Sequence, residues 1–146
     1  MVAKNFRFNY AIPKSGGPVV TINEYCLAFN SVVVEFLGKP EKVAIGFDEQ
    51  NHAIGVRPTL PEDDSTLVST YEFGKKVDEY GWVRVAMKDF LRYVAHGSEV
   101  DFLNGAVQFI PEFDEDNKMV IILVDQEHVK GRKKQEENVV ESPAQR

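Results

Sequence analysis

The chain has little cysteine and little histidine, and both shortages exclude kinds of site. Cys26 is the single cysteine, so no disulfide can form within the chain and cysteine alone cannot build a thiolate metal site. The three histidines, His52, His96 and His128, are scattered, and none lies at the i, i+4 spacing of metal ligands on a helix. We therefore expect no metal site.

The sequence also lacks long apolar runs. No stretch approaches the ~20 apolar residues of a membrane span. Residues 1–10 carry charge and have no apolar core of signal-peptide length. We expect a cytoplasmic protein that does not enter the membrane.

Catalytic and phosphate-binding motifs are missing as well. Ser15-Gly16-Gly17-Pro18 is rich in glycine, but it lacks the Lys-Ser/Thr ending of a phosphate-binding loop and the spacing of a dinucleotide-binding turn. No Gly-x-Ser-x-Gly nucleophile elbow is found. The sequence therefore predicts no cofactor, no catalytic residue and no enzymatic activity.

The charge is acidic overall but unevenly distributed. Residues 126–146 hold five Lys/Arg and four Asp/Glu, a net charge of +1, so the total of −6 leaves −7 for residues 1–125. An acidic body has no general attraction to nucleic acid. Composition is otherwise ordinary for a globular domain, with 43% hydrophobic and 27% charged residues.

The most informative feature is an internal repeat. Phe47-Asp48-Glu49-Gln50-Asn51 recurs as Phe113-Asp114-Glu115-Asp116-Asn117, and each copy lies between two apolar runs. A β-like run and a helix-like run precede each copy, which gives the order β-α-β-β twice. We therefore predict an α+β fold in which two β-α-β-β repeats share a mostly antiparallel sheet or barrel-like core about a pseudo-twofold axis.

This organisation implies one globular domain. It covers residues 1–125, with repeats at about 1–60 and 66–125, and the Pro- and acid-rich segment 58–64 lies between the repeats. Residues 126–146 lack hydrophobic periodicity, and we predict a disordered tail.

The clearest predicted helix covers residues 24–37. Its apolar residues fall at i, i+3, i+4, i+7, i+8, i+11 and i+12, which forms one continuous stripe. Asn23 is the predicted N-cap, Gly38 suits the left-handed position after the last turn, and Pro40 prevents continuation. The stripe consists of Tyr25, Ala28, Phe29, Val32, Val33, Phe36 and Leu37.

The other elements follow from shorter patterns. Alternating aromatics predict a strand within residues 1–18, and a second strand is expected at 82–85. Helical spacing recurs from Met87 to Val94. Two hairpins are expected, 42–47 with 52–57 and 106–113 with 118–124. Residues 66–80 fit either a short helix or a strand.

The candidate binding residues are cations near the two predicted helices. If the repeats pair about a pseudo-twofold axis, these cations could gather on one face and contact phosphates. Ordinary solvated charge is the alternative interpretation. The set is Lys39, Lys42, Arg84, Lys88 and Arg92.

The segment from Val19 to Pro58 resembles the AbrB-type swapped-hairpin half-domain. It has a strand, a helix ending in Leu37-Gly38, and a hairpin from Val43 to Val56. Two such halves in one chain resemble the MraZ arrangement, which implies a pseudo-dimeric β-barrel and a DNA-binding transcriptional regulator. The chain departs from that pattern at Ile22-Asn23-Glu24-Tyr25 and lacks an MraZ-type Asp-x-x-x-Arg motif. The two-part layout also resembles uncharacterised bacterial proteins.

Two functions fit these observations, and an enzyme is the third alternative, for which the sequence offers no set of coupled titrating groups. The first is a non-enzymatic module that binds another protein or assembles with itself, for example as a homodimer. The alternative is an AbrB-like regulator that binds DNA through the five cations above.

Overall fold

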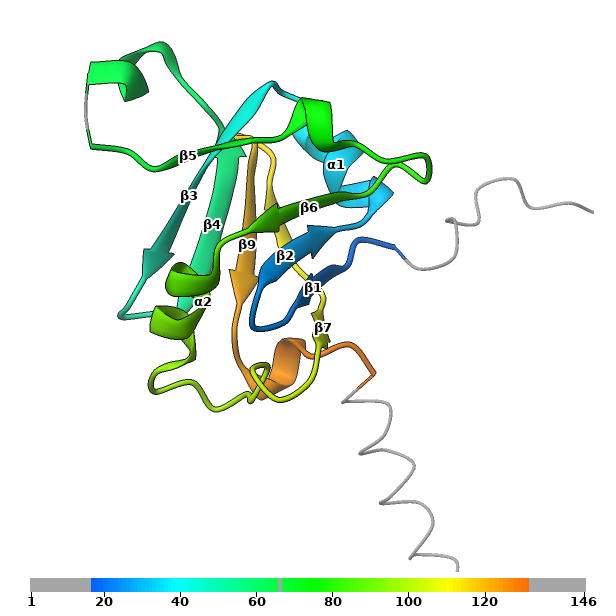
Figure 1. Cartoon of the computed structure of the whole chain (residues 1–146), viewed down its shortest axis with the longest axis vertical. Coiled ribbons are helices and arrows are strands. Elements are labelled where there is room, and N and C mark those ends of the chain that lie inside the picture. The colour runs from blue at the N-terminus through cyan, green and yellow to red at the C-terminus, as the bar shows by residue number, and fades with distance from the viewer. Residues whose placement is uncertain (1–16, 66, 132–146) are drawn as a thin grey trace, which may run out of the picture.

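The computed structural model describes residues 17–65 and 67–131, which form two antiparallel sheets and two α-helices, an α+β fold. In Figure 1 the strands β6, β2 and β1 lie in front of β3, β4 and β9, and one hydrophobic core lies between the two sheets. Neither α-helix of the described chain is long and apolar enough to cross a membrane.

The four-stranded sheet has the order β6-β2-β1-β7. Core-facing side chains alternate with outward ones most clearly in β6, where Val83 and Val85 are buried and Arg84 and Ala86 are exposed. The strands are β1 (Val20–Ile22), β2 (Cys26–Phe29), β6 (Val83–Ala86) and β7 (Val107–Phe109).

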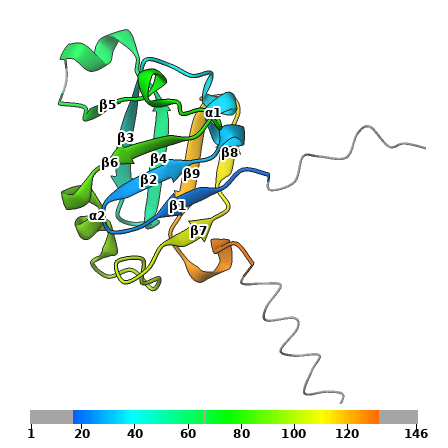
Figure 2. The same ribbon diagram turned by 45° about the vertical axis from the view of Figure 1, so that its right-hand side comes forward.

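The five-stranded sheet has the order β5-β3-β4-β9-β8, and Figure 2 shows β8 at the edge nearest α1. Its strands are β3 (Lys42–Asp48), β4 (Ala53–Pro58), β5 (Thr70–Glu72), β8 (Glu112–Asp114) and β9 (Met119–Leu123). The helices are α1 (Ser31–Leu37) and α2 (Lys88–Ala95), with 3-10 turns η1 (Pro61–Ser65), η2 (Gly74–Lys76) and η3 (Gln126–His128).

The start of the first helix was predicted wrongly. Residues 26–29 form β2, which pairs with both β1 and β6, and the helix begins only at Ser31. Asn30 is the N-cap, and its Oδ1 accepts the Val33 N–H at 3.3 Å. The predicted cap, Asn23, instead accepts the Tyr25 and Cys26 N–H groups in the turn between β1 and β2.

The end of that helix agrees with the prediction. Gly38 has φ of 82°, in the left-handed region, and its N–H donates to the Val34 and Glu35 carbonyl oxygens. α2 at Lys88–Ala95 also agrees with the helical spacing from Met87 to Val94. The strand expected at 82–85 is β6.

The first predicted hairpin is present as β3 and β4. Asp48 closes its turn, because its carboxylate accepts the Asn51 backbone N–H at 3.1 Å and the Asn51 side-chain amide at 2.8 Å. His52 then has φ of 53°. Asp114 and Asn117 make the same two bonds at 3.2 and 2.8 Å, and Lys118 also has φ of 53°.

The second predicted hairpin is only partly correct. Residues 107–109 form β7, which pairs with β1 in the four-stranded sheet, whereas β8 pairs with β9 in the other sheet. The chain changes sheets at Ile110 and Pro111, because proline has no N–H with which to continue a ladder.

Four predicted segments differ from the structure or lie outside it. Residues 66–80 contain both β5 and η2, and the segment between the predicted repeats contains η1. The fold continues past Asp125, because η3 follows it and Val129 forms a bridge with Phe109. The strand expected among the first residues, and the tail from 132 onward, lie outside the described residues.

Candidate functional site

The outer face of the five-stranded sheet carries a cavity of 590 Å³. A volume of this size is typical of a ligand-binding cleft. Small or apolar residues form most of it, with Gly46 and Gly55 on the floor and Met119 and Ile121 along one side. We call this surface the trough.

The trough is hollow because of strand register. Gly46 of β3 pairs with Gly55 of β4, so two side chains are missing side by side at the centre of the sheet. A β-carbon added at Gly46 would meet no atom within 4 Å, whereas one added at Gly55 would lie 3.4 Å from the Met119 sulfur. Ala44 and Ala53, two residues away on the same face, are also small.

A wall of the trough comes from the chain that leads into β5. The Ile45 N–H donates to the Ser69 carbonyl at 3.3 Å, which holds residues 67–69 beside β3. Leu67 in this wall is fully exposed to solvent. The loop that contains η1 precedes this wall in the chain, and on the left of Figure 1 it extends away from the sheet. The trough therefore presents apolar surface that nothing in the described chain covers.

Carboxylates lie at the ends of the trough. Asp48 lines one end, and the Asn51 hydrogen bonds hold the pKa of its carboxyl below the usual range. Near the other end, Arg57 forms two hydrogen bonds with Asp63, at 2.9 and 3.1 Å, and this contact lowers the pKa of Asp63. Because Asp63 neutralises Arg57, the trough has no excess of positive charge.

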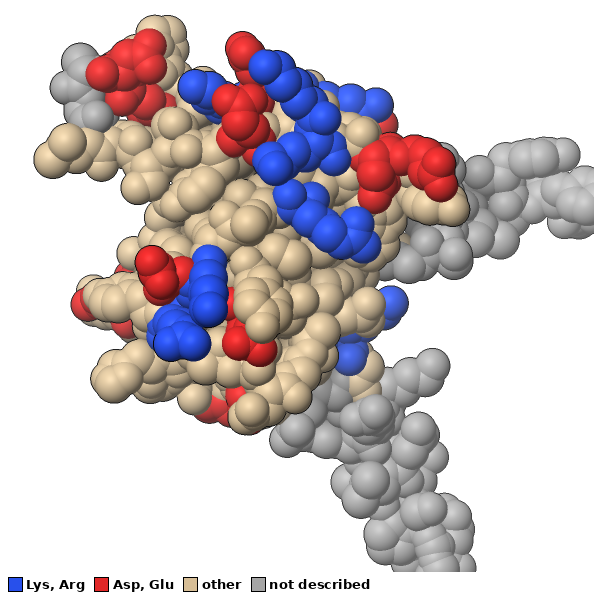
Figure 3. Space-filling model, in the orientation of Figure 1, with Lys and Arg blue, Asp and Glu red and all other residues tan. Residues whose placement is uncertain are grey.

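The five predicted phosphate-contacting cations do not form one cluster. Figure 3, which views the molecule from the side of β6, β2 and β1, shows a band of Lys and Arg side chains over η2 and β6 and a smaller group over α2. Lys88 and Arg92 belong to α2, and the Lys88 ammonium lies 5.7 Å from the ring centroid of Tyr25. Three of the five residues therefore lie apart from these two.

The other three predicted cations are each close to a carboxylate. Lys39 lies 3.2 Å from Glu35, Lys42 lies 4.0 Å from Glu72, and Arg84 lies 3.3 Å from Asp78. The Arg84 guanidinium also lies 5.7 Å from the centroid of Trp82. Acidic neighbours therefore offset much of this positive charge.

Sequence reasoning missed two lysines that belong with this band. Lys75 and Lys76 form η2, and η2 lies against the segment that follows α1, because the Phe73 and Gly74 N–H groups donate to the Glu41 carbonyl. A β-carbon at Gly74 would lie 3.0 Å from the Pro40 carbonyl oxygen. The two lysines were not identified because residues 66–80 had no assigned structure. We call Lys39, Lys42, Lys75, Lys76 and Arg84 the basic band.

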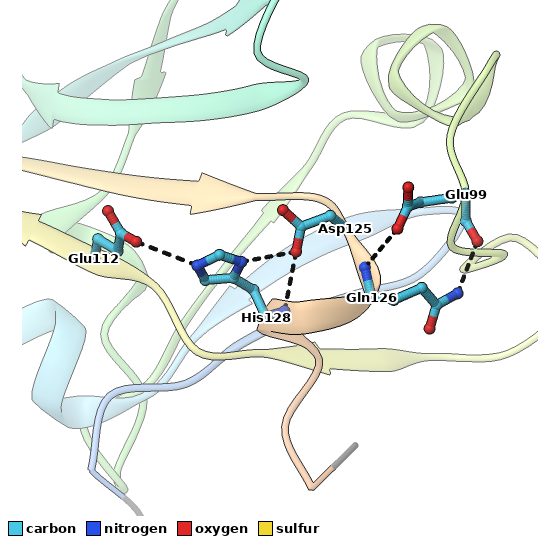
Figure 4. Close-up of polar contacts among 5 residues, drawn as sticks. All are labelled: Glu99, Glu112, Asp125, Gln126 and His128. Atoms are coloured by element: carbon cyan, nitrogen blue, oxygen red, sulfur yellow. Dashed lines mark hydrogen bonds and ion pairs between the residues drawn. The ribbon is translucent and has the colours of Figure 1, made fainter. Parts of the chain in front are cut away.

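A second polar arrangement surrounds His128 (Figure 4). Its Nδ1 lies 2.7 Å from Asp125 and its Nε2 lies 3.2 Å from Glu112, so the ring lies between two carboxylates. Burial alone would lower the pKa of His128, but the hydrogen bonds to Asp125 and Glu112 outweigh it and raise that pKa above 6.5. Each ring nitrogen faces a carboxylate, so the arrangement ties η3 to β8.

Neighbouring contacts hold the same segment. The Gln126 N–H donates to the Glu99 carboxylate at 2.9 Å, and the Gln126 side-chain amide donates to the Glu99 carbonyl at 2.8 Å (Figure 4). Within residues 17–65 and 67–131, no group of three or more His, Cys, Asp and Glu side chains is placed to hold a metal ion. Cys26 is partly buried and forms no disulfide.

Comparison with known proteins adds no relative. No family model, no curated protein and no solved structure matches the chain.

Proposed function

We propose that this chain is a non-enzymatic protein-binding or assembly module that binds an apolar segment in the trough. The glycine pair Gly46 and Gly55 is the observation that supports this function most directly. Glycine weakens a strand interior, and it commonly marks a place where another backbone or a ligand approaches closely. Two glycines side by side at the centre of a sheet are consistent with selection for space above them.

The trough has enough apolar surface to contribute useful binding energy. Met119 and Ile121 are only half-buried on the outer face of β9, and Leu67 is exposed. Complete burial of one such side chain contributes ~1.5–3 kcal/mol. A few of these contacts would offset the cost of ordering a short partner segment.

Gly46→Val is the variant that tests this function. A β-branched side chain favours the strand, and the added atoms have open space, so the variant should fold with unchanged or higher thermal stability. The same side chain fills the trough and should block the partner. Ala86→Val is the matched control, since Ala86 is exposed on β6 in the other sheet.

A peptide-display library selected on the immobilised full chain supplies the binding assay. Selected peptides should bind the parent and Ala86→Val with equal affinity and should lose at least tenfold in affinity for Gly46→Val. Peptides that bind Gly46→Val as tightly as the parent would contradict a binding role for the trough.

We also propose that the two halves of the chain are related by a pseudo-twofold axis. The antiparallel pairs β2–β6 and β4–β9 each join equivalent strands of the two halves. The aromatic that precedes each Asp-Asn turn packs on the helix of the other half, Phe47 on Phe90 of α2 and Phe113 on Phe36 of α1. This cross-packing supports the resemblance to swapped-hairpin proteins.

DNA binding is the second candidate function, and the basic band supports it. Lys75 and Lys76 add two cations to the three predicted ones that lie beside η2. Phosphate contacts of this kind make affinity fall linearly with salt on logarithmic axes. The acidic neighbours of the band favour the trough as the primary site.

Fluorescence anisotropy with a mixed-sequence duplex tests this alternative. If the band contacts phosphates, Lys42→Glu combined with Arg84→Glu should abolish binding by the full chain at low salt. Lys88→Glu with Arg92→Glu, the matched pair on α2, should weaken it much less. Equal loss from the two double variants would contradict a dedicated role for the band.

A further inference from the structure

Residues 4–12 of the chain have the composition that the trough would accept. Phe6, Phe8 and Tyr10 stand at alternate positions, and a small or apolar residue follows at 11 and 12. In an extended segment alternate side chains point to the same side. We infer that the trough of one copy binds this N-terminal segment of a second copy, an inference that rests on the proposed function.

The apolar surfaces match in size and kind. The floor at Gly46 and Gly55 lacks side chains, and the cavity of 590 Å³ can receive large side chains from above. Aromatic side chains bury the most apolar area per residue and lose few rotamers when they bind. Three aromatics on one side of a strand could therefore lie along the floor between Leu67 and Ile121.

The charges are complementary. Lys4, Arg7 and Lys14 precede the first acidic residue of the chain, Glu24, so this segment is purely cationic. Asp48 stays ionised at one end of the trough, and the exposed acidic residues of η1 lie near the other. Arg57, the cation inside the trough, is already paired with Asp63 and so repels the segment little.

The position of residue 17 favours a second copy over the same chain. The Gly17 carbonyl accepts the Asn30 side-chain amide at 2.7 Å, which fixes the start of the described chain beside α1. In Figures 1 and 2 this point lies on the opposite side of the molecule from β5 and the loop with η1. A segment from the same chain would have to pass around the sheet edge, whereas two copies can exchange segments reciprocally about a twofold axis.

Sedimentation velocity of the full chain tests the inference directly. The parent and Ala86→Val should form dimers in a concentration-dependent manner. Gly46→Val, which keeps the segment but fills the trough, should be monomeric. The double variant Phe6→Ser/Phe8→Ser, which keeps the trough but loses the aromatics, should be monomeric too.

Mixing the two monomeric variants gives the decisive result. One contributes an intact segment and the other an intact trough, so a heterodimer should form, at least tenfold weaker than the parent dimer. A Gly46→Val protein that self-associates like the parent would overturn the inference, as would a mixture that stays monomeric.

A peptide of residues 1–16 separates failure of this inference from failure of the proposed function. If the parent is monomeric and only Phe6→Ser/Phe8→Ser binds the peptide, the segment lies in the trough of its own chain and the second-copy inference is wrong. If no variant binds the peptide but library peptides still distinguish Gly46→Val from the parent, the inference fails and the trough function stands. Failure of both assays overturns both proposals.

Discussion

Phe36 of α1 stacks on Phe113 of β8, with ring centroids 4.1 Å apart and an angle of 11° between the ring planes. The two residues come from opposite halves of the chain. Phe47 of β3, in the first half, contacts Phe90 and Tyr93 of α2, in the second half, edge to face at 6.4 and 5.9 Å. Each β-hairpin is therefore held by a helix that the other half supplies.

The Phe36–Phe113 contact should be visible as an energetic coupling. Phe36→Leu and Phe113→Leu keep most of the apolar volume but remove the stacked rings. We expect the double variant to lose less stability than the sum of the single variants, by ~0.5–1.5 kcal/mol. Urea denaturation of the four proteins measures this coupling. Phe36→Leu combined with Phe47→Leu is the control, because the two rings belong to separate aromatic contacts. The stability losses of these two variants should be nearly additive.

Phe29 and Tyr25 should respond very differently to truncation, although sequence periodicity placed both on one helical stripe. Phe29 is fully buried in β2 against Phe73, so Phe29→Ala should cost ~3–5 kcal/mol. Tyr25 is 56% exposed, so Tyr25→Ala should cost less than ~1 kcal/mol. Chemical denaturation checks both values, and equal costs would support the continuous helix instead.

Asn30 should be the residue that sets the start of α1. Its Oδ1 caps the helix at Val33, and its amide holds the Gly17 carbonyl. Loss of a cap costs ~1 kcal/mol, and Asn30→Ala should exceed that value because it removes the second bond as well. Asn30→Asp keeps the capping oxygen and loses only the donor, so a thermal melt should place it between the parent and Asn30→Ala.

The contacts of His128 should make stability depend on pH. Its pKa is raised in the folded state, so the protonated ring stabilises η3. This contribution is fully present below the ordinary histidine pKa of 6.5, and it is lost as pH rises through the higher folded value. The melting temperature of the parent should therefore fall between mildly acidic and mildly alkaline pH.

His128→Gln isolates that effect, because His52 and His96 are retained. The difference in melting temperature between the parent and His128→Gln should be largest at the acidic end and should shrink as pH increases. A constant difference across the range would mean that protonation of His128 does not stabilise the fold.

Local sequence signals predicted several elements correctly. The first hairpin, α2, β6 and the Gly38 cap all depend on residues near in sequence, and each was predicted. The start of α1 was wrong because Tyr25, Ala28 and Phe29 match helical spacing by coincidence while they belong to a strand or to the turn before it. Pairing of β2 with β6 decides their conformation, and a local pattern does not contain that information.

The candidate sites depended still more on long-range contacts. The sequence does contain a pattern that indicates the trough floor. Small residues stand at alternate positions, Ala44 with Gly46 and Ala53 with Gly55. The wall could not be predicted, because residues 67–69 reach β3 only after η1. The basic band likewise needed the contact of η2 with the segment after α1, which joins residues more than thirty positions apart.

Strand pairing between the first and second halves of the chain has a consequence for folding. β1 pairs with β7, β2 with β6 and β4 with β9, so much of the ladder joins early residues to late ones. Such non-local pairings slow folding, because the chain must close large loops before the contacts form. A polypeptide cut between β4 and β5 would leave two fragments with unpaired strand edges and exposed apolar faces. Neither fragment should fold alone, and the two should assemble into the native structure when they are mixed.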